Sequence, residues 1–377
     1  MPDVLLAGAF GQGNPGDEAL LSAFLRSLPP GRVQVASSDP TATASNHGCN
    51  AFAPTPSAVA RELARSDAVV VGGGTVFKLL HAASGRARHA LLRNALLLAH
   101  GARTLGMPVL LVGVGVGDLS TRWSQRITRS LVRGADLLVL RDEESAAVLT
   151  GIGAPAPFRV GTDPAWTVLD EPRETEFGVD ATSRTAVIVV SHLAGGTELP
   201  RAVADWVRVL RDLGMRVRLQ PWQAGEPSNG DGDLARRVAA RVGDDVDVVE
   251  PPADLADARR QFAGARLVIG MRYHALMAAA AAGVPFVAVD HELKLGALAR
   301  RFGQPCVAPT EPPAHMAAAA RAALDGPPPA RSMVLEQIAL AEEGFRLLRL
   351  VLEGGGAPDA DELRGLPLEP APWEVAQ

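Results

Sequence analysis

Cysteine is scarce in this sequence. Only Cys49 and Cys306 occur among its 377 residues, and they lie far apart in the chain. This spacing is typical of reduced thiols and matches neither a disulfide framework nor a zinc motif. We therefore predict no metal site and no cofactor, and we leave open whether a divalent metal assists.

Runs of positive charge are missing as well. No block of lysine or arginine occurs in the sequence, and the formal net charge is −5. Nucleic-acid backbones are bound by clustered positive charge, so we predict that nucleic acid is not a partner.

Long apolar runs are also missing. The longest, Ala275 to Val289, contains Gly-Val-Pro and is shorter than the ~20 residues that span a bilayer. The opening residues, MPDVLLAGAF, lack the basic region of a secretory signal. We expect a cytoplasmic protein without a transmembrane segment, and we leave peripheral membrane association and the oligomeric state open.

Short apolar runs do occur, and they alternate with amphipathic stretches along the whole chain. This alternation is typical of an α/β fold with parallel sheets. A polar segment at residues 171–184 separates two series of such runs, which predicts two Rossmann-like parallel-sheet domains facing a cleft. We place the domains at residues 1–175 and 183–353, and interpret residues 354–377 as a tail or a return crossing. The runs of the two series are VLLAGA, RVQVASS, AVVVGGG, PVLLVGVGV and DLLVLRD, then TAVIVVS, RVRLQ, VDVVE, RLVIG and PFVAV.

Glycine-rich loops follow several predicted strands, at the edge where parallel sheets bind ligands. The first, AFGQGNPGDEALL, matches neither the dinucleotide fingerprint nor the lysine-containing phosphate loop. Its glycines can bring backbone N–H groups close to an anion, or the loop can be a tight turn in which Asp17 and Glu18 complement a helix dipole. Close approach to a ligand and a crowded turn are equally open for VVVGGGTVF and LVGVGVGDL. The candidate loop contacts are Gly13, Asn14, Gly73, Gly74 and Gly115.

Cationic side chains gather at the ends of the later strands. Arg272 and His274 follow the strand RLVIG at a strand-to-helix turn, and Lys294 comes from the loop after the next strand. A histidine flanked by two cations is typical of a site for an anion that must be protonated. Arg141, at the end of VLVLRD, can clamp a carboxylate or phosphate, or it can pair with Asp142 or Glu144.

In this order, the motifs resemble those of the polysaccharide pyruvyl transferase family. The resemblance covers nearly the whole chain and implies a glycosyltransferase-B-like fold. It also implies transfer of the enolpyruvyl unit of phosphoenolpyruvate to a sugar, glycan or lipid-linked saccharide of the cell envelope. The product is a pyruvate ketal, phosphate is released, and phosphoenolpyruvate is a co-substrate with no further cofactor. The matching stretches are GNPGDEA, GGG, GVGVG, RDEES, DPA, LQPWQ and GMRYHAL with the following GVP and K.

The resemblance assigns roles by matching positions. The second domain would bind the donor through Arg272 and Lys294, with Arg141 of the first domain as a further donor-binding candidate and His274 as the general acid. Apart from the resemblance, the reaction itself needs a carboxylate to remove protons from sugar hydroxyls, and Asp17 or Glu18 of the first domain, expected to be the acceptor side, is placed to do this. Aromatic residues make up only 4% of the chain, so stacking on a sugar would use Trp166 or Trp222, each of which can equally be a packing residue.

The chain departs from the family pattern in two places. His291, Glu292 and Leu293 stand before the lysine where the family usually has Tyr-Asp-Pro. An arginine expected near the end of TAVIVVS is missing, and His192 can replace it. Two alternative functions remain open: a nucleotide-sugar glycosyltransferase of the same architecture, and a non-catalytic protein that binds a phosphorylated ligand.

Overall fold

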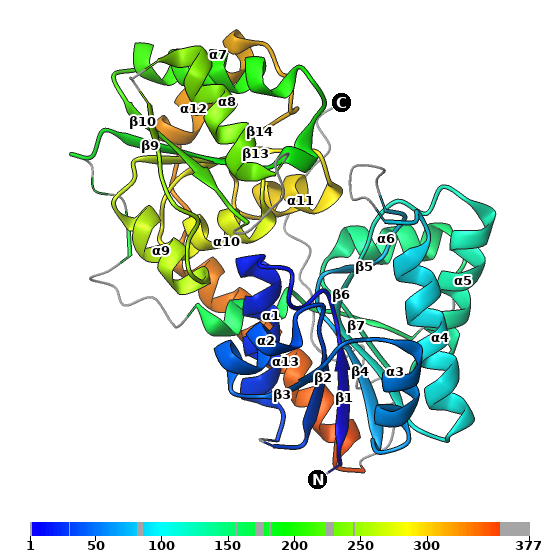
Figure 1. Cartoon of the computed structure of the whole chain (residues 1–377). Helices are drawn as coiled ribbons and strands as arrows, with labels where there is room; N and C mark the ends of the chain where they lie inside the picture. The colour runs from blue at the N-terminus through cyan, green and yellow to red at the C-terminus, as the bar shows by residue number, and fades with distance from the viewer. Residues whose placement is uncertain are drawn as a thin grey trace.

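The computed structural model describes residues 2–29, 31–80, 86–154, 157–169, 177–178, 180, 182–223, 230–243 and 246–354. Strands and helices alternate through this part of the chain and form two units (Figure 1). The strands of the first unit are β1 (Val4–Ala7), β2 (Val33–Ala36), β3 (Asn50–Phe52), β4 (Ala68–Gly72), β5 (Thr75–Phe77), β6 (Val109–Val116), β7 (Leu137–Leu140) and β8 (Arg159–Val160). Its helices are α1 (Pro15–Ser27), α2 (Pro40–His47), α3 (Pro56–Leu63), α4 (Ala90–Thr104), α5 (Arg122–Arg133), α6 (Glu143–Gly151) and the 3₁₀ turn η2 (Pro164–Val168).

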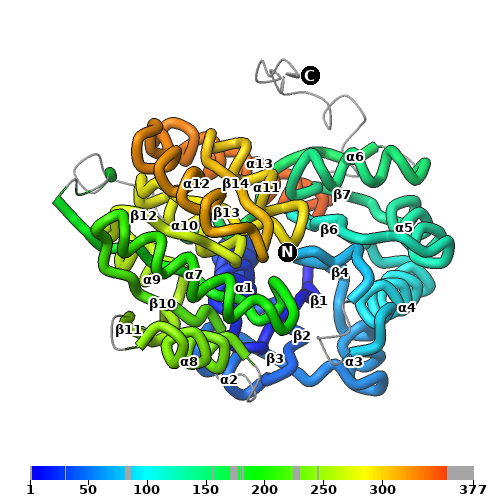
Figure 2. Tube along the Cα trace, turned by 90° about the horizontal axis from the view of Figure 1, so that it is seen from above, coloured from blue at the N-terminus to red at the C-terminus, as the bar shows by residue number. Residues whose placement is uncertain are grey.

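The second unit repeats the same alternation and lies beside the first (Figure 2). Its strands are β9 (Thr185–Val190), β10 (Arg216–Pro221), β11 (Val246–Val248), β12 (Leu267–Gly270), β13 (Phe286–Val289) and β14 (Cys306–Val307). Its helices are the 3₁₀ turn η4 (His192–Ala194), α7 (Leu199–Asp212), α8 (Asp231–Val242), α9 (Leu255–Ala263), α10 (Tyr273–Ala281), α11 (Leu293–Arg301) and α12 (Pro313–Asp325), and the chain continues into α13 (Arg331–Leu352).

Both sheets are parallel and share one winding pattern. The first runs β3-β2-β1-β4-β6-β7-β8, with β5 paired to β6 off this path, and the second runs β11-β10-β9-β12-β13-β14. In each sheet the strand order reverses beside the first strand, which creates a switch point where open α/β sheets bind ligands. The two switch points lie between β1 and β4 and between β9 and β12.

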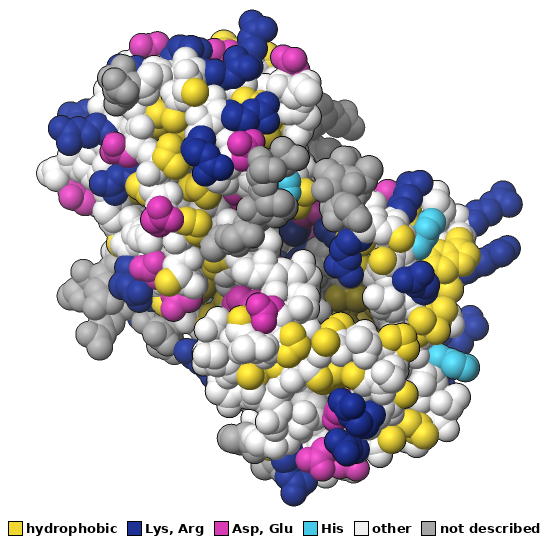
Figure 3. All heavy atoms as spheres, in the orientation of Figure 1, with side chains coloured by type: hydrophobic (Ala, Val, Ile, Leu, Met, Phe, Trp, Pro, Cys, Tyr) yellow, Lys and Arg dark blue, Asp and Glu magenta, His cyan; other side chains and the backbone are white. Residues whose placement is uncertain are grey.

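The central strands are hydrophobic throughout because helices cover both faces of each sheet. Every residue of β4, β6 and β12 is buried, as expected for interior strands of a parallel sheet. The predicted fold class is therefore confirmed: two Rossmann-like parallel-sheet units in a glycosyltransferase-B-like arrangement. Figure 3 shows the surface hollowed between the two lobes.

The last helix returns to the first sheet. α13 packs on β6 and β7, and the ring of its Phe345 meets Phe24 of α1 edge-on at 5.1 Å. Residues 331–352 therefore lie in the first unit's layers, although the sequence analysis groups them with the second domain. The domain limits stay a prediction. Beyond Gly354, the predicted tail lies outside the described residues.

One hydrophobic cluster connects the two units. It contains Leu20 and Phe24 of α1, Phe345 of α13, Phe262 of α9 and the buried alanines of α10. Because these helices cover the facing sides of both sheets, their packing sets the positions of the N-termini of α1 and α10. Among the described residues, no helix combines the length and the apolar character needed to cross a membrane.

Candidate functional site

The loop after β1 folds into a cap for α1. Asn14 accepts a hydrogen bond from the N–H of Gly16 at 3.0 Å, and its amide donates to Asp17 Oδ2 at 2.8 Å. Gly11 and Gly13 adopt φ values of 75° and 66°, which other residues rarely adopt. The glycines thus build the turn, and the asparagine orients Asp17.

His274 packs against the start of α1. A Cβ atom added to Gly16 would lie 2.0 Å from His274 Nδ1, so the imidazole occupies the space that a side chain would need. His274 comes from the first turn of α10, and only 8% of its surface is exposed. The glycine in NPGDEA therefore permits contact between the first unit's helix and the second unit's histidine.

The other imidazole nitrogen faces a buried carboxylate. His274 Nε2 lies 3.5 Å from Asp163 Oδ2, and Asp163 is fully buried at the start of η2. Burial raises the pKa of Asp163, but His274 and Arg141 outweigh this effect and hold the pKa below its ordinary value. Asp163 is therefore ionised, and its carboxylate lies beside the imidazole of His274.

Arg141 lies behind this pair rather than at the surface. Its Nη1 is 3.7 Å from Asp163, its Nε donates to Asp142 at 3.0 Å, and its Nη2 donates to Thr75 at 3.3 Å. A Cβ atom on Gly115 would lie 2.5 Å from this guanidinium, so Gly115 makes room for Arg141. The role of Arg141 in donor binding stays a prediction.

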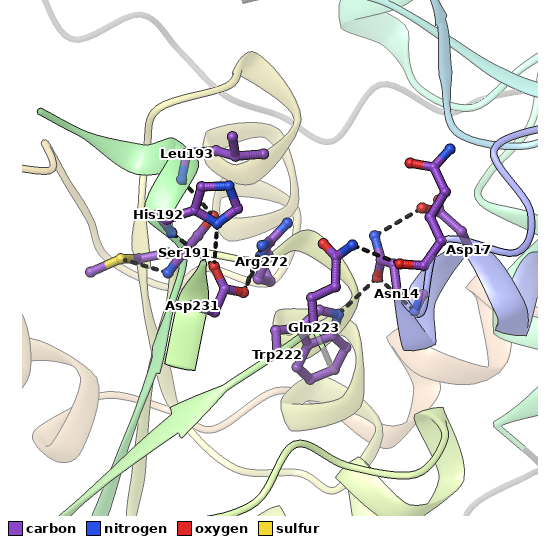
Figure 4. Close-up of polar contacts among 12 residues, drawn as sticks. Asn14, Asp17, Ser191, His192, Leu193, Trp222, Gln223, Asp231 and Arg272 are labelled. Atoms are coloured by element: carbon purple, nitrogen blue, oxygen red, sulfur yellow. Dashed lines mark hydrogen bonds and ion pairs between the residues drawn. The ribbon is translucent and has the colours of Figure 1, made fainter. Parts of the chain in front are cut away.

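Asp231 bonds both Arg272 and His192 at the second unit's switch point (Figure 4). Its Oδ2 accepts from Arg272 Nη2 at 2.6 Å, and its Oδ1 lies 2.8 Å from both the backbone nitrogen and Nδ1 of His192. Burial raises the pKa of Asp231, but the hydrogen bonds from His192 and the charge of Arg272 outweigh this effect. The pKa therefore lies below its ordinary value. His192 thus lies beside Arg272, where the sequence analysis expected an arginine.

Two lysines from different units meet on one carboxylate. Glu292 accepts from Lys78 Nζ, at the end of β5, at 2.8 Å, and Lys294 Nζ lies 2.6 Å from its other oxygen. Although burial raises the pKa of Glu292, the lysines hold it well below the ordinary value. Burial lowers the pKa of Lys294, and the charge of Lys78 lowers it further.

Tyr273 forms a platform beneath these cations. Arg141 lies 4.9 Å and Lys294 5.9 Å from the centre of its ring, while the imidazole of His274 meets the ring edge-on at 5.4 Å. Burial raises the pKa of Tyr273, so the hydroxyl stays neutral. It is the only tyrosine in the chain.

Asp17 and Glu18, adjacent in sequence, have different surroundings. Burial raises the pKa of Asp17, and the charges of His274, Lys294 and Arg272 partly oppose that rise. Glu18 instead accepts from the N–H of Gly11 at 2.9 Å and lies 2.8 Å from His47 Nε2. The structure therefore places Asp17, rather than Glu18, among the cations.

The remaining candidates differ in their surroundings. Gly73 has φ 63° and lies against Leu20, and Gly74 has φ 71° with no neighbour within 4 Å of an added Cβ. Trp166 and Trp222 are fully buried, so neither offers an exposed ring for a sugar. Trp222 Nε1 instead donates to Asn14 Oδ1 at 3.2 Å and connects the two units (Figure 4).

Sequence reasoning missed four residues of the site: Asp163, Asp231, Lys78 and Tyr273. Asp163 belongs to the DPA stretch, in which an aspartate before a proline indicates the start of a helical turn. In the structure Asp163 caps that turn and accepts from the N–H of Ala165 at 3.0 Å. Lys78 follows the GGG strand end, and Asp231 begins a helix. Among the described residues, no group of three or more His, Cys, Asp or Glu side chains could hold a metal ion.

Comparison with protein families decides the relationship. The family model for polysaccharide pyruvyl transferase matches residues 14–292. The chain belongs to this family. The match supports a transferase of polysaccharide biosynthesis, and it includes Asp17, Asp163 and His274, whereas Lys294 lies just beyond it. A search of curated proteins finds no match.

Solved structures of similar fold cover almost the whole of this family member. MnaA of S. aureus with UDP has a TM-score of 0.62 at 12% identity and covers 94% of this chain and 97% of its own. HepE of Anabaena with UDP-glucose has a TM-score of 0.59 at 15% identity, covering 93% and 99%. UDP-GlcNAc 2-epimerase of Methanocaldococcus jannaschii with UDP-GlcNAc and UDP has 0.60 at 12%, covering 93% and 100%. At these identities the likeness concerns the fold.

Proposed function

We propose that this family member transfers the enolpyruvyl unit of phosphoenolpyruvate to a saccharide and forms a pyruvate ketal. One proton joins the donor's methylene carbon, which becomes a methyl group. Two sugar hydroxyl oxygens bond to C2, the bond from C2 to the phosphate oxygen breaks, and phosphate leaves. The hydroxyl groups lose two protons, which balance the proton taken up by carbon and one carried away with phosphate.

The observation that carries this proposal is the position of His274. The imidazole of His274 is held between the ionised carboxylate of Asp163 and the start of α1. Together with Arg272 and Lys294, His274 lowers the pKa of Asp17 against the effect of burial. A proton donor next to cations suits a donor molecule that is an anion and must be protonated. With Asp163 beside Nε2, His274 is the proton donor in this proposal.

The cations supply the donor site in this proposal. Phosphoenolpyruvate carries a carboxylate and a phosphate close together, so it needs several fixed positive groups. Arg272 is fixed by Asp231, and Lys294 and Lys78 are fixed by Glu292. Arg272 stands at the N-cap of α10 and Lys294 in the first turn of α11, so both helix dipoles also favour an anion.

Asp17 is the base in this proposal. Its raised pKa makes the carboxylate a better proton acceptor than an ordinary aspartate, and Asn14 holds it at the helix start. We place the sugar, glycan or lipid-linked acceptor beside the loop that contains Gly13 and Asn14. Because Trp166 and Trp222 are buried, polar and backbone groups would have to recognise the sugar.

An assay of products tests the function. Purified protein is incubated with phosphoenolpyruvate and a panel of saccharides, and phosphate release is measured together with the ketal methyl signal by proton NMR. Both should require the saccharide. Since the solved structures of similar fold contain UDP or UDP-sugars, UDP-glucose and UDP-GlcNAc are tested in parallel. Release of UDP with glycosidic transfer would establish the alternative glycosyltransferase, and donor binding without turnover on any acceptor would favour a binding protein. The cytoplasmic location stays a prediction.

Replacement of the proposed acid tests the mechanism. His274→Gln should retain donor binding but lose turnover by roughly 10²- to 10⁴-fold, the usual contribution of general acid catalysis. His315→Gln, on the exposed surface of α12, is the matched control and should keep full turnover. A folded, donor-binding His274→Gln protein with normal turnover would refute the assignment.

A further inference from the structure

Charge is distributed unevenly along the chain. Residues 68–135 contain one lysine and eight arginines but only one acidic residue, Asp118, although the whole chain has a net charge of −5. These cations are not consecutive. The helices of this stretch, α4 and α5, pack side by side on the same face of the first sheet (Figures 1 and 2).

The helical period places the arginines of α5 in one row. Four arginines occupy positions i, i+4, i+7 and i+11, and α4 presents a comparable row of exposed residues. Hydrophobic side chains stand among them: Leu97 is 64%, Leu105 56% and Trp123 42% exposed. Figure 3 shows arginine and hydrophobic side chains together over α4 and α5 on the right-hand lobe. We define the α4–α5 face as Arg93, Leu97, Leu105, Arg122, Trp123, Arg126 and Arg133.

The positive charge of this face is not neutralised by its neighbours. Among the described residues, the side chains of Arg93, Arg122, Arg126 and Arg133 form neither an ion pair nor a hydrogen bond. Exposed arginines elsewhere are often paired, as Arg300 is with Glu144 at 2.8 Å. The α4–α5 face therefore combines uncompensated positive charge with exposed apolar side chains.

The face also extends to the edge of the site. In a parallel α/β sheet, each helix begins near the carboxyl end of the strand before it. The N-termini of α4 and α5 therefore lie at the same edge of the first sheet as Lys78 and the loop after β1. At this end, the ring of Trp123 meets His89 edge-on at 4.7 Å, which fixes the tryptophan at the surface.

We propose that the α4–α5 face docks on an anionic membrane surface. Arginines bind lipid phosphates, while tryptophan and leucine enter the interface between headgroups and acyl chains. Nucleic acid would also attract the arginines, but it offers no apolar layer for Leu97, Leu105 and Trp123. A flat membrane contacts only the α4–α5 face. A long nucleic acid would extend beyond this face and be repelled by the rest of the protein, which carries net negative charge. If the proposed function holds, docking brings the acceptor side to a lipid-linked saccharide.

Vesicle binding tests the docking without reference to catalysis. The full chain is sedimented with vesicles of phosphatidylglycerol and phosphatidylcholine and, separately, of phosphatidylcholine alone. We expect binding to the anionic vesicles only, weakened by added salt. Insertion of Trp123 should shift the fluorescence emission to shorter wavelength, and Trp123→Phe should abolish that shift.

A charge-matched pair of variants locates the surface. The triple variant Arg93→Gln, Arg122→Gln and Arg126→Gln should weaken vesicle binding by about 100-fold, since each cation near an anionic surface contributes roughly a factor of five. The control removes the same charge from exposed arginines of the second unit, Arg201→Gln, Arg236→Gln and Arg241→Gln, and should bind almost as the parent does.

Four results would overturn the proposal. The first is an absence of binding to anionic vesicles, and the second is equal loss in the two triple variants. The third is a dimer that forms without lipid and dissociates in the Arg93, Arg122 and Arg126 variant, which would make the face an interface between copies. Duplex DNA is included as a competitor, and tighter binding to DNA than to vesicles would also contradict membrane docking.

Discussion

At the scale of single residues, two adjacent carboxylates have different chemistry. Asp17 and Glu18 look equivalent in the sequence, but a helix turns successive side chains by about 100°. Asp17 therefore faces the charges of His274, Lys294 and Arg272, whereas Glu18 bonds Gly11 and His47. Burial raises the pKa of Asp17, so its charge opposes folding at neutral pH while preparing the group to accept a proton.

Asp17→Asn should therefore lose activity and gain stability. Turnover should fall by roughly 10²-fold or more because no base remains. A carboxyl whose pKa is raised by folding destabilises the folded state above its ordinary pKa, so the variant should melt at a higher temperature at pH 7, and this difference should disappear in acid. Parent turnover should decline on acidification through a pKa above the ordinary value of 3.8.

Glu18→Gln is the matched control for this prediction. The amide oxygen can still accept from Gly11, and only the charge beside His47 is lost. Turnover should remain near that of the parent. If Glu18→Gln is inactive while Asp17→Asn turns over normally, the assignment of the base is reversed.

Asp163→Asn should lower the stability of the protein, whereas Asp17→Asn should raise it. Because folding lowers the pKa of Asp163, its charge stabilises the protein above the ordinary pKa, and the contribution is lost as pH falls through the folded value. The variant should lose about 2 kcal/mol at pH 7. It should also lose turnover by about 10²-fold, with little change in donor KM, because His274 is no longer oriented.

Asp142→Asn separates the two effects of the Asp163 change. Asp142 is the other carboxylate on Arg141, and it caps α6 without contacting His274. It should lose stability but keep turnover. Calorimetry and single-turnover kinetics on both variants decide the matter, and equal kinetic defects would make Asp163 a merely structural partner of Arg141.

At the scale of elements, the site depends on two helix starts that lie against each other. The start of α1 with its N-cap provides residues 14–17, and the start of α10 with its N-cap provides residues 272–274. The two helices belong to units that have separate sheets. Gly16 is a point of contact between them, because its missing side chain leaves the space that His274 fills. A local change in α1 should therefore affect a residue of the other unit.

Gly16→Ala tests this contact. The new Cβ would lie 2.0 Å from Nδ1, so His274 must leave its position against α1, and turnover should fall about 10²-fold. Alanine favours a helix over glycine by roughly 1 kcal/mol, so α1 itself should survive. Gly151→Ala in α6, where nothing lies within 4 Å, should leave turnover unchanged. Activity in Gly16→Ala equal to the parent would show that the imidazole relocates without consequence.

At the scale of the whole molecule, the two units act together. They share a hydrophobic cluster through α1, α9, α10 and α13, and polar contacts such as Lys78 with Glu292 and Asn14 with Trp222 connect the site's two sides. A donor bound among these groups should therefore order segments of both units.

Hydrogen exchange with and without phosphoenolpyruvate measures this coupling. A ligand present at 100 times its Kd should stabilise the folded protein by about 2.7 kcal/mol. Amide protection should increase at the starts of both α1 and α10. Protection confined to α10 would place the donor in the second unit alone and leave Lys78 out of the site.

The sequence determined the architecture because its signals are local. Uninterrupted apolar runs indicate interior strands, and their alternation with amphipathic stretches requires parallel sheets with crossover helices. Arg272 and His274 could be placed at a ligand edge for the same reason: they directly follow the buried strand β12, and the carboxyl ends of parallel strands share one edge. The row of arginines on α5 can also be recognised in the sequence, but only from the helical spacing of the arginines, because they are not consecutive.

The tertiary structure decided which groups meet. Asp163 reaches His274 and Lys78 reaches Glu292 across 214 positions only because two separately wound sheets pack through a common core. The same packing buries Trp166 and Trp222, directs Asp17 rather than Glu18 to the cations, and returns α13 to the first sheet. Local periodicity fixes which face of an element is apolar. The distance between side chains on different elements depends on how those faces fit together, and that is a property of the folded chain.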